Sequence, residues 1–106
     1  MHSWSDAGSW TPVCYTADHA FAHSMWSKPR EITHGFYQEN GFEIAYRMPG
    51  GVTPEVAIDG WLGSSPHAAV ILEEGRWHSA NWLAMGVAIY GEYAVAWFGK
   101  EPDSTP

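Results

Sequence analysis

The stretch 85-MGVAIYGEYAVAWF-98 carries the clearest structural signal in the chain. Two runs of apolar, β-branched and aromatic residues flank Gly91 and Glu92, and glycine suits the positive φ of a two-residue hairpin turn. In the register that this turn predicts, large side chains meet small ones. The predicted pairs are Tyr90 with Tyr93, Ile89 with Ala94, Ala88 with Val95, Val87 with Ala96, Gly86 with Trp97 and Met85 with Phe98.

Both faces of this predicted hairpin are apolar, so we expect other layers to cover both sides of the sheet. Residues 16–28 predict one covering helix, because Thr16 is a suitable N-cap and Pro29 would stop or bend the helix. Residues 1–15 are rich in Ser, Gly and Pro, and we interpret them as an irregular segment anchored by its two tryptophans.

Residues 53–62 predict a second covering helix, with Thr53 as N-cap and Pro54 at the first helical position. The Gly, Ser and Pro residues of 63–66 end it. The apolar island 42–46 predicts a further short strand. Together these elements indicate an α/β domain in which helices are layered on a small, largely antiparallel sheet.

The composition excludes several classes of protein. The chain has 106 residues, of which 45% are hydrophobic and 16% charged, a composition typical of one globular domain. Its net charge of −7 and its five Lys and Arg residues leave no basic stripe for nucleic acid. No apolar run approaches the ~20 residues of a membrane span. Cys14 is the sole cysteine, so an internal disulfide is impossible.

Six histidines raise the question of a metal site. His19 and His23 stand four residues apart on the predicted helix 16–28, a spacing that lets two imidazoles reach one ion. Their HAFAH segment lacks the glutamate of the HExxH motif, and a partly exposed helix face is the alternative interpretation. His34 and His78 lie among polar neighbours and are expected at the surface.

Other catalytic and binding patterns are weak. There is no Gly-rich phosphate loop and no G-x-S-x-G motif. Seven tryptophans could form a stacking platform for sugars, but Trp61 and Trp97 fit positions in the core. What remains is a dispersed set, His2, Glu43 and His67, in which each residue stands beside an apolar or aromatic segment.

Several segments together resemble one family. The run 54-PEVAIDGWLGSSPHAAVIL-72, followed by 84-AMGVAIYGEYAVAWFG-99, resembles the C-terminal half of the CAP (SCP) superfamily, which contains cysteine-rich secretory proteins, antigen five and pathogenesis-related class 1 proteins. Upstream, 41-GFEIAY-46 is similar to the family's GENIAYG segment, and 2-HSWSD-6 to the segment with its first histidine.

The resemblance implies a three-layer α-β-α sandwich and a single CAP-like domain over residues 1–106. It also implies that the family's first helix would precede Met1, on a segment that could hold a partner for Cys14. In the family, two histidines and two acidic residues line a cleft, and the histidines can hold a divalent ion such as zinc. His2 and His67 match those histidines and Glu43 matches one acid, whereas 63–64 stands where the second acid would be.

Three functions follow as alternatives. The first is a secreted, extracellular module that binds a small apolar ligand or a protein partner in the cleft. The second is a hydrolase in which a metal at His2 and His67 activates water and Glu43 is the base. The third is sugar binding on exposed tryptophans. The missing second acid and the lack of a nucleophile motif favour binding over catalysis.

Overall fold

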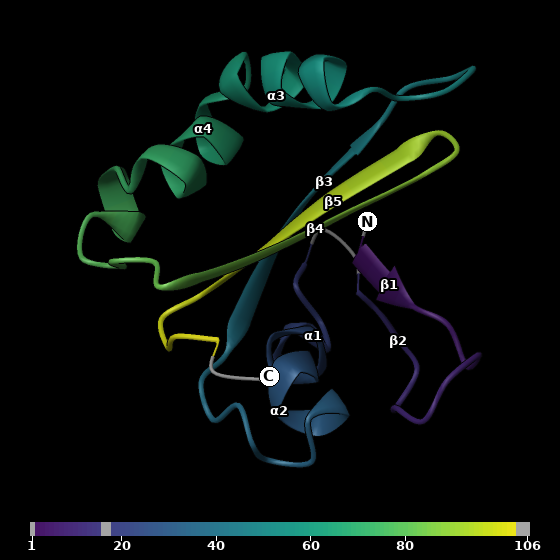
Figure 1. Ribbon diagram of the computed structural model, residues 1–106, viewed down its shortest axis with the longest axis vertical. Helices are drawn as coiled ribbons and strands as arrows, with labels where there is room; N and C mark the ends of the chain where they lie inside the picture. Colours follow the sequence, from purple (N-terminus) through teal and green to yellow (C-terminus); the bar gives the residue numbers. More distant parts are fainter. Residues whose placement is uncertain (1, 16–17, 104–106) are drawn as a thin grey trace.

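The computed structural model describes residues 2–15 and 18–103 (Figure 1). Within these ranges the chain forms five strands, four α-helices and one 3-10 helix. Their order is β1 (His2–Trp4), β2 (Val13–Tyr15), α1 (Ala22–Trp26), α2 (Lys28–Ile32), β3 (Gly41–Arg47), α3 (Pro54–Leu62), α4 (Ser65–Leu72), η1 (Gly75–Trp77), β4 (Ala84–Tyr90) and β5 (Tyr93–Gly99).

The centre of the fold is an antiparallel sheet with strand order β3-β5-β4. The predicted hairpin is confirmed: all six predicted pairs occur in the register of β4 and β5, and Gly91 in the turn has φ +60°. The apolar island 42–46 lies within β3, which pairs with β5 along its whole length. The expected α/β class with an antiparallel sheet is therefore confirmed.

One face of the sheet packs against α3 and α4 (Figure 1). Side chains alternate along a strand, so Ile44 of β3 and Ala96 and Phe98 of β5 point to this face. They form a buried cluster with Trp61 of α3 and Val70 of α4. Burial of apolar surface contributes about 25 cal/mol per Å², so this cluster is the main source of the fold's stability.

On the other side of the sheet lie α1, α2 and the small β1–β2 pair (Figure 1). The N-terminal segment is thus more regular than predicted, because β1 and β2 pair antiparallel from His2 to Trp4. Its expected anchoring by tryptophans is confirmed by the edge-on contact of Trp4 with Trp10, whose ring centroids lie 4.9 Å apart. An edge-to-face pair of this kind stabilises the loop between the two strands.

The predicted helix 53–62 is confirmed as α3. Thr53 caps it by accepting a 3.2 Å hydrogen bond from Val56 N, and Pro54 stands in the first turn. The prediction that 63–66 only ends this helix is incomplete, because Pro66 stands in the first turn of a new helix, α4. The fixed φ of proline suits a helix start as well as a helix stop.

The predicted helix 16–28 is wrong in extent. Its proposed N-cap, Thr16, lies outside the described residues. His19 and Phe21 have φ values of 62° and 65°, and this left-handed conformation is incompatible with a helix before Ala22. The helix does break just before Pro29: α1 ends at Trp26, and Pro29 stands in the first turn of α2.

The expectation that both faces are covered holds for β5 but not for β4. Met85, Val87 and Ile89 of β4 point to the side of α3 and α4, yet 66%, 69% and 45% of their surfaces are exposed. The edge strand therefore extends past the helices that cover its neighbour. Among the described residues, every helix is too short or too polar to cross a bilayer.

Candidate functional site

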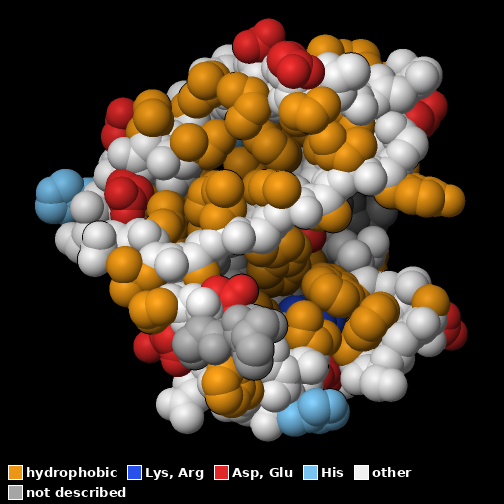
Figure 2. Space-filling view, in the orientation of Figure 1, with side chains coloured by type: hydrophobic (Ala, Val, Ile, Leu, Met, Phe, Trp, Pro, Cys, Tyr) orange, Lys and Arg blue, Asp and Glu red, His pale blue; other side chains and the backbone are white. Residues whose placement is uncertain are grey.

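A cavity of about 630 Å³ lies between the sheet and α2, on the face opposite α3 and α4. Strand β1 and the segment 101–103 after β5 complete its walls. In Figure 2 a hollow separates the part of the molecule with α3, α4 and β4 from the part with α1 and α2. Most of the lining is apolar and includes Trp4, Ile32, Phe36, Gly86, Val95 and Trp97.

The cavity exists because the first three residues on one side of β4 are small. Ala84, Gly86 and Ala88 alternate along the strand and therefore share a face. A Cβ at Gly86 would have no neighbour within 4 Å, so this glycine borders open space. Its cross-strand partner on β5 is Trp97, which provides the aromatic wall.

Gly41 of β3 allows Trp97 to lie where it does. A Cβ at Gly41 would stand 2.7 Å from the Trp97 ring and 2.6 Å from Pro29 Cγ, closer than real Cβ contacts. Trp97 was predicted to be a core residue, but it is only partly buried and lines the cavity. The core prediction is correct for Trp61, which is 5% exposed.

Glu43 is one of the polar residues that line the cavity. This residue is the register partner of Trp97, and its Oε2 accepts a 2.8 Å hydrogen bond from Trp97 Nε1. Its Oε1 lies 2.5 Å from His2 Nδ1, with 22% of the His2 and 10% of the Glu43 side chain exposed. Because a carboxylate accepts, Nδ1 of His2 carries a proton, and Nε2 is the nitrogen that would bind an ion.

His67 lies in the first turn of α4, and its Nδ1 is 2.8 Å from Ser64 Oγ. Burial lowers the pKa of His67 below its ordinary value, and the nearby charge of His2 lowers this pKa further. A neutral imidazole is the form that binds metals. The structure thus joins His2 of β1 to Glu43 of β3, and His67 of α4 is near enough to His2 for their charges to interact.

The residues near these histidines offer few further metal ligands. Among the described residues, no group of three or more His, Cys, Asp and Glu side chains is placed to hold an ion. His2 and His67 would therefore supply the protein ligands, and water would complete the coordination. The carboxylate of Glu43 fits the supporting position behind a metal-binding imidazole.

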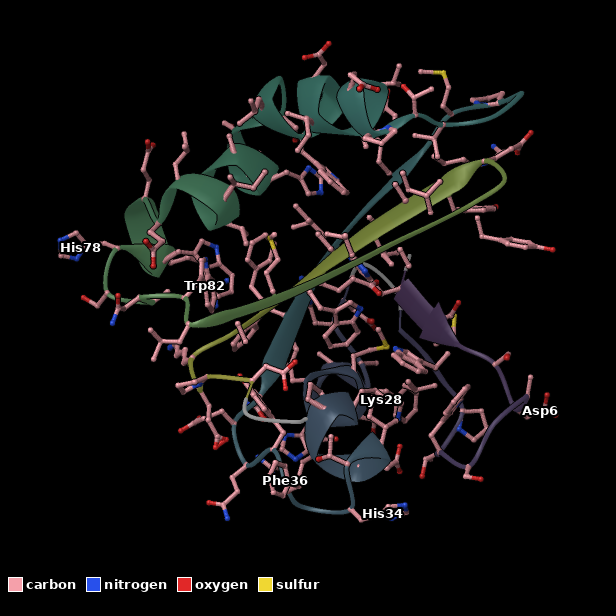
Figure 3. The ribbon with its side chains drawn as sticks, viewed as in Figure 1. Asp6, Lys28, His34, Phe36, His78 and Trp82 are labelled. Atoms are coloured by element: carbon pink, nitrogen blue, oxygen red, sulfur yellow. The ribbon has the colours of Figure 1, made fainter. Side chains whose placement is uncertain are left out.

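The histidine pair at 19 and 23 is not a helical pair. His19 lies before α1 with a φ of 62°, so the i, i+4 geometry that the spacing predicts does not form. The surface positions of His34 and His78 are confirmed, and Figure 3 shows both at the periphery. Cys14 is exposed on β2.

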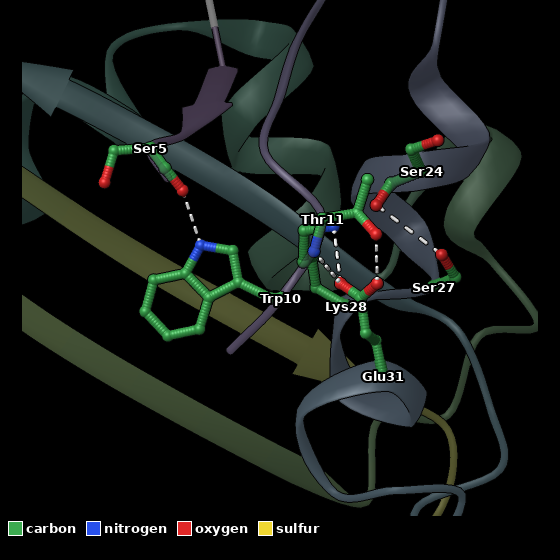
Figure 4. A network of polar contacts seen from close by, with 7 residues as sticks. All are labelled: Ser5, Trp10, Thr11, Ser24, Ser27, Lys28 and Glu31. Carbon is green, nitrogen blue, oxygen red and sulfur yellow. Dashed lines mark hydrogen bonds and ion pairs between the residues drawn. The ribbon is translucent and has the colours of Figure 1, made fainter. Parts of the chain in front are cut away.

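An ion pair with a buried lysine and a partly exposed glutamate stands beside the cavity. Lys28 of α2 is 1% exposed, lines the cavity and binds Glu31 at 2.9 Å (Figures 3 and 4). Glu31 also accepts hydrogen bonds from Thr11 N and Oγ1, at 3.0 and 2.6 Å. The Thr11 hydroxyl, followed by Lys28, lowers the pKa of Glu31 to about 2. The charge of Lys28 is thus compensated within the protein.

Sequence reasoning missed most of this lining. The residues from α2 and from 36–37 carry no motif. A usable signal was present on β4, where Ala84, Gly86 and Ala88 recur with period two and Gly86 stands opposite Trp97 of β5. A strip of small side chains across from an aromatic residue indicates either a tightly packed neighbour or a cavity.

Comparison with protein-family models, curated proteins and solved structures finds no match to this chain. The functional interpretation therefore depends on the geometry of the site.

Proposed function

We propose that this protein is a binding module that takes a small, largely apolar ligand into the cavity between the sheet and α2. The observation that supports this most directly is the cavity itself, whose volume of about 630 Å³ lies in the range of small-molecule sites. Its walls are mainly apolar, and Glu43 and Lys28 are among the polar residues that line it.

The polar groups suggest how the ligand is oriented. Both oxygens of Glu43 already accept hydrogen bonds, and Lys28 is paired with Glu31. A charged ligand would therefore find no uncompensated partner among these groups, and burying it would be costly. We infer a ligand with a neutral apolar body and at most one small polar group, directed toward Glu43.

The test uses N-phenyl-1-naphthylamine, a neutral probe that fluoresces in apolar surroundings. We expect saturable binding to the native protein and loss of binding in Gly86→Phe, because a Cβ at this position meets no neighbour and the ring beyond it would occupy the cavity. The matched control is Ile89→Lys on the same strand, which removes exposed apolar surface outside the cavity. Its probe affinity should be unchanged.

The two variants separate the possible results. If Ile89→Lys loses the probe and Gly86→Phe retains it, the probe binds the exposed face of β4 and the proposal is wrong. Absence of saturable binding to the folded native protein would also contradict it. Circular dichroism establishes that both variants are folded.

A second candidate function is the holding of a divalent ion by His2 and His67. It is supported by the lowered pKa of His67, to which His2 contributes, and by the hydrogen bonds that orient both Nδ1 atoms. Zinc should raise the melting temperature of the native protein, and His67→Ala should abolish that rise while retaining the fold. An unchanged zinc effect in His67→Ala would dismiss the site.

Catalysis and sugar binding have less support. A hydrolase needs Glu43 as the base, but this carboxylate is engaged by His2 and Trp97 and is better suited to orienting His2. A sugar platform needs exposed, coplanar rings, whereas Trp4 meets Trp10 at 82° and Trp97 at 76°. We therefore place both behind ligand binding.

We also propose that the fold is the three-layer α-β-α sandwich of the CAP family and that the protein is secreted. The support is the presence of helices on both sides of the sheet (Figure 1), the contact of His2 with Glu43, and the electrostatic effect of His2 on His67. An experimental structure that superposes on a CAP domain over the sheet and α4 would test the family. Detection of the protein outside the cells that make it would test secretion.

A further inference from the structure

Strand β4 is an open edge of the sheet. The strand order is β3-β5-β4, so β4 pairs with β5 on one side and with none of the described strands on the other. The sequence of Ala84–Tyr90, AMGVAIY, contains no charged residue and no proline. Natural edge strands usually carry such residues because they prevent pairing with another chain. Strand β4 therefore lacks the charged residues and prolines that usually protect an edge strand from pairing with another chain.

The face beside this edge is also apolar and exposed. Figure 2 shows hydrophobic side chains gathered along β4 and over α3 and α4. Besides Met85, Val87 and Ile89 of β4, the exposed residues are Ile58 and Leu62 of α3 and Leu72 of α4, each 45% to 69% accessible. They present several hundred Å² of apolar surface, comparable with the roughly 800 Å² that each partner buries in a standard interface.

The hydrogen-bond pattern shows which groups face outward. Met48 N donates to Glu92 O at 2.9 Å, so the even-numbered residues of β5 exchange hydrogen bonds with β3 and the odd-numbered ones with β4. The β4 partners of these odd-numbered residues are its even-numbered residues. It follows that the N–H and C=O groups of Met85, Val87 and Ile89 point away from the sheet.

We propose that the partner of this surface is a second copy of the chain, paired antiparallel through β4 around a two-fold axis at Val87. In this register Val87 meets Val87 of the second copy, and Met85 meets Ile89 in both directions. These are the residues whose backbone groups point outward, so register and hydrogen-bond pattern agree. The product is a continuous six-stranded sheet.

The side chains in this register are also compatible. A two-fold axis perpendicular to the sheet keeps α3 and α4 of both copies on the same face, so the exposed apolar rows of the two β4 strands become neighbours. On the cavity face, Gly86 stands opposite Ala88 and Ala84 opposite Tyr90, pairing small residues with small or large ones. No like charges meet across this pair of strands.

Net charge predicts how the dimer responds to salt. Each copy carries −7, which opposes association at long range, while the strands that would pair are uncharged. Added salt screens this repulsion, and the uncharged pairing strands contain no ion pair that salt would weaken. The dimer should therefore become more stable as salt concentration rises.

The first test is sedimentation velocity of the native protein over a range of concentrations. We expect a species of twice the single-chain mass of 11.8 kDa, and a dissociation constant about 100-fold higher or more in Val87→Lys, which places two like charges at the axis. The matched control is Phe21→Lys, which also replaces an apolar residue that is 69% exposed, but before α1. It should remain dimeric.

Amide hydrogen exchange of the native protein is a second test that needs no variant. The Met85, Val87 and Ile89 amides should exchange slowly at concentrations where the dimer forms and rapidly after dilution. The Ala94 amide, in the central strand, should be protected in both cases.

Three results would overturn the proposal. A native protein that is monomeric at every concentration would leave this face to a different cover, such as a segment of another protein. A dimer that survives Val87→Lys, with that variant folded, would place the interface elsewhere. A dimer without concentration-dependent protection of the three β4 amides would associate through side chains alone.

Discussion

The two faces of the sheet use adjacent residues for different purposes. On one face Ile44 and Phe98 are buried under α3 and α4, and on the other their chain neighbours Glu43 and Trp97 border a cavity. Side-chain alternation along the strands produces this division. Residues that stabilise the fold and residues that line the cavity are therefore neighbours in the sequence but can be changed separately. The substitutions below test that separation.

The largest effect is expected on the packed face. Phe98→Ala should lower the free energy of unfolding by about 3–5 kcal/mol, the usual cost of truncating a core aromatic residue. Its register partner Met85 points to the same side but is 66% exposed, against 7% for Phe98. Urea denaturation of the monomer measures both.

Met85→Ala is the matched control and should cost less than about 0.5 kcal/mol in the monomer. Equal costs for the two variants would mean that β4 is covered as well as β5, contrary to the structure.

The next effect is expected at the ion pair beside the cavity. Glu31→Gln leaves Lys28, which is 1% exposed, without its carboxylate, and an unpaired buried charge is strongly destabilising. The melting temperature should fall clearly at pH 7. A matched Glu74→Gln, at an exposed glutamate, should leave it unchanged.

The same ion pair has a pH signature. The pKa of Glu31 is lowered to about 2 in the folded protein, whereas its ordinary value is 4.5. The unfolded chain therefore binds the proton first, and the contribution of Glu31, present above pH 4.5, is lost as pH falls toward 2. Glu31→Gln should flatten this part of the profile. An unchanged slope would mean that other carboxylates cause it.

A smaller loss is expected on the cavity face. Trp97→Phe keeps an aromatic wall but removes the N–H that donates to Glu43. Loss of one hydrogen bond to a charged acceptor should cost about 1.5–3 kcal/mol, less than Phe98→Ala. The affinity for N-phenyl-1-naphthylamine should change in this variant, because Trp97 lines the cavity. A cost as large as that of Phe98→Ala would place Trp97 in the core.

The smallest effect is expected from His67. Its pKa is lowered in the folded protein by burial and then by His2, so the unfolded chain binds a proton more readily. Stability should therefore decrease as pH falls below the unfolded pKa of about 6.5, and the loss should be complete below the folded pKa. His67→Asn should make the slope shallower between pH 7 and 5. If the slope is unchanged, another group titrates there.

The sequence predicted the parts that depend on local chemistry. The hairpin register followed from Gly91 and from period-two alternation, and α3 followed from Thr53 and Pro54. The start of α1 could not be predicted, because nothing in the local sequence indicates the left-handed conformations of His19 and Phe21. Pro66 was ambiguous because proline both ends and begins helices.

The candidate site, too, was predictable from the sequence only in part. His2, Glu43 and His67 were identified through a family resemblance, and the folded chain places His2 in contact with Glu43 and within electrostatic range of His67. The cavity was not predicted, because α2 reaches it only through tertiary packing. Its position on β4 was visible only as the strip Ala84, Gly86 and Ala88, whose meaning depends on what lies opposite.

One titration compares the two faces directly. The indole N–H groups of Trp97, at the cavity, and Trp61, buried in the core without a partner among the described residues, give separate signals in a nitrogen–proton NMR spectrum. On addition of N-phenyl-1-naphthylamine, the Trp97 signal should shift saturably and the Trp61 signal should stay in place. A saturable shift of Trp61 with Trp97 unmoved would contradict ligand binding in the cavity.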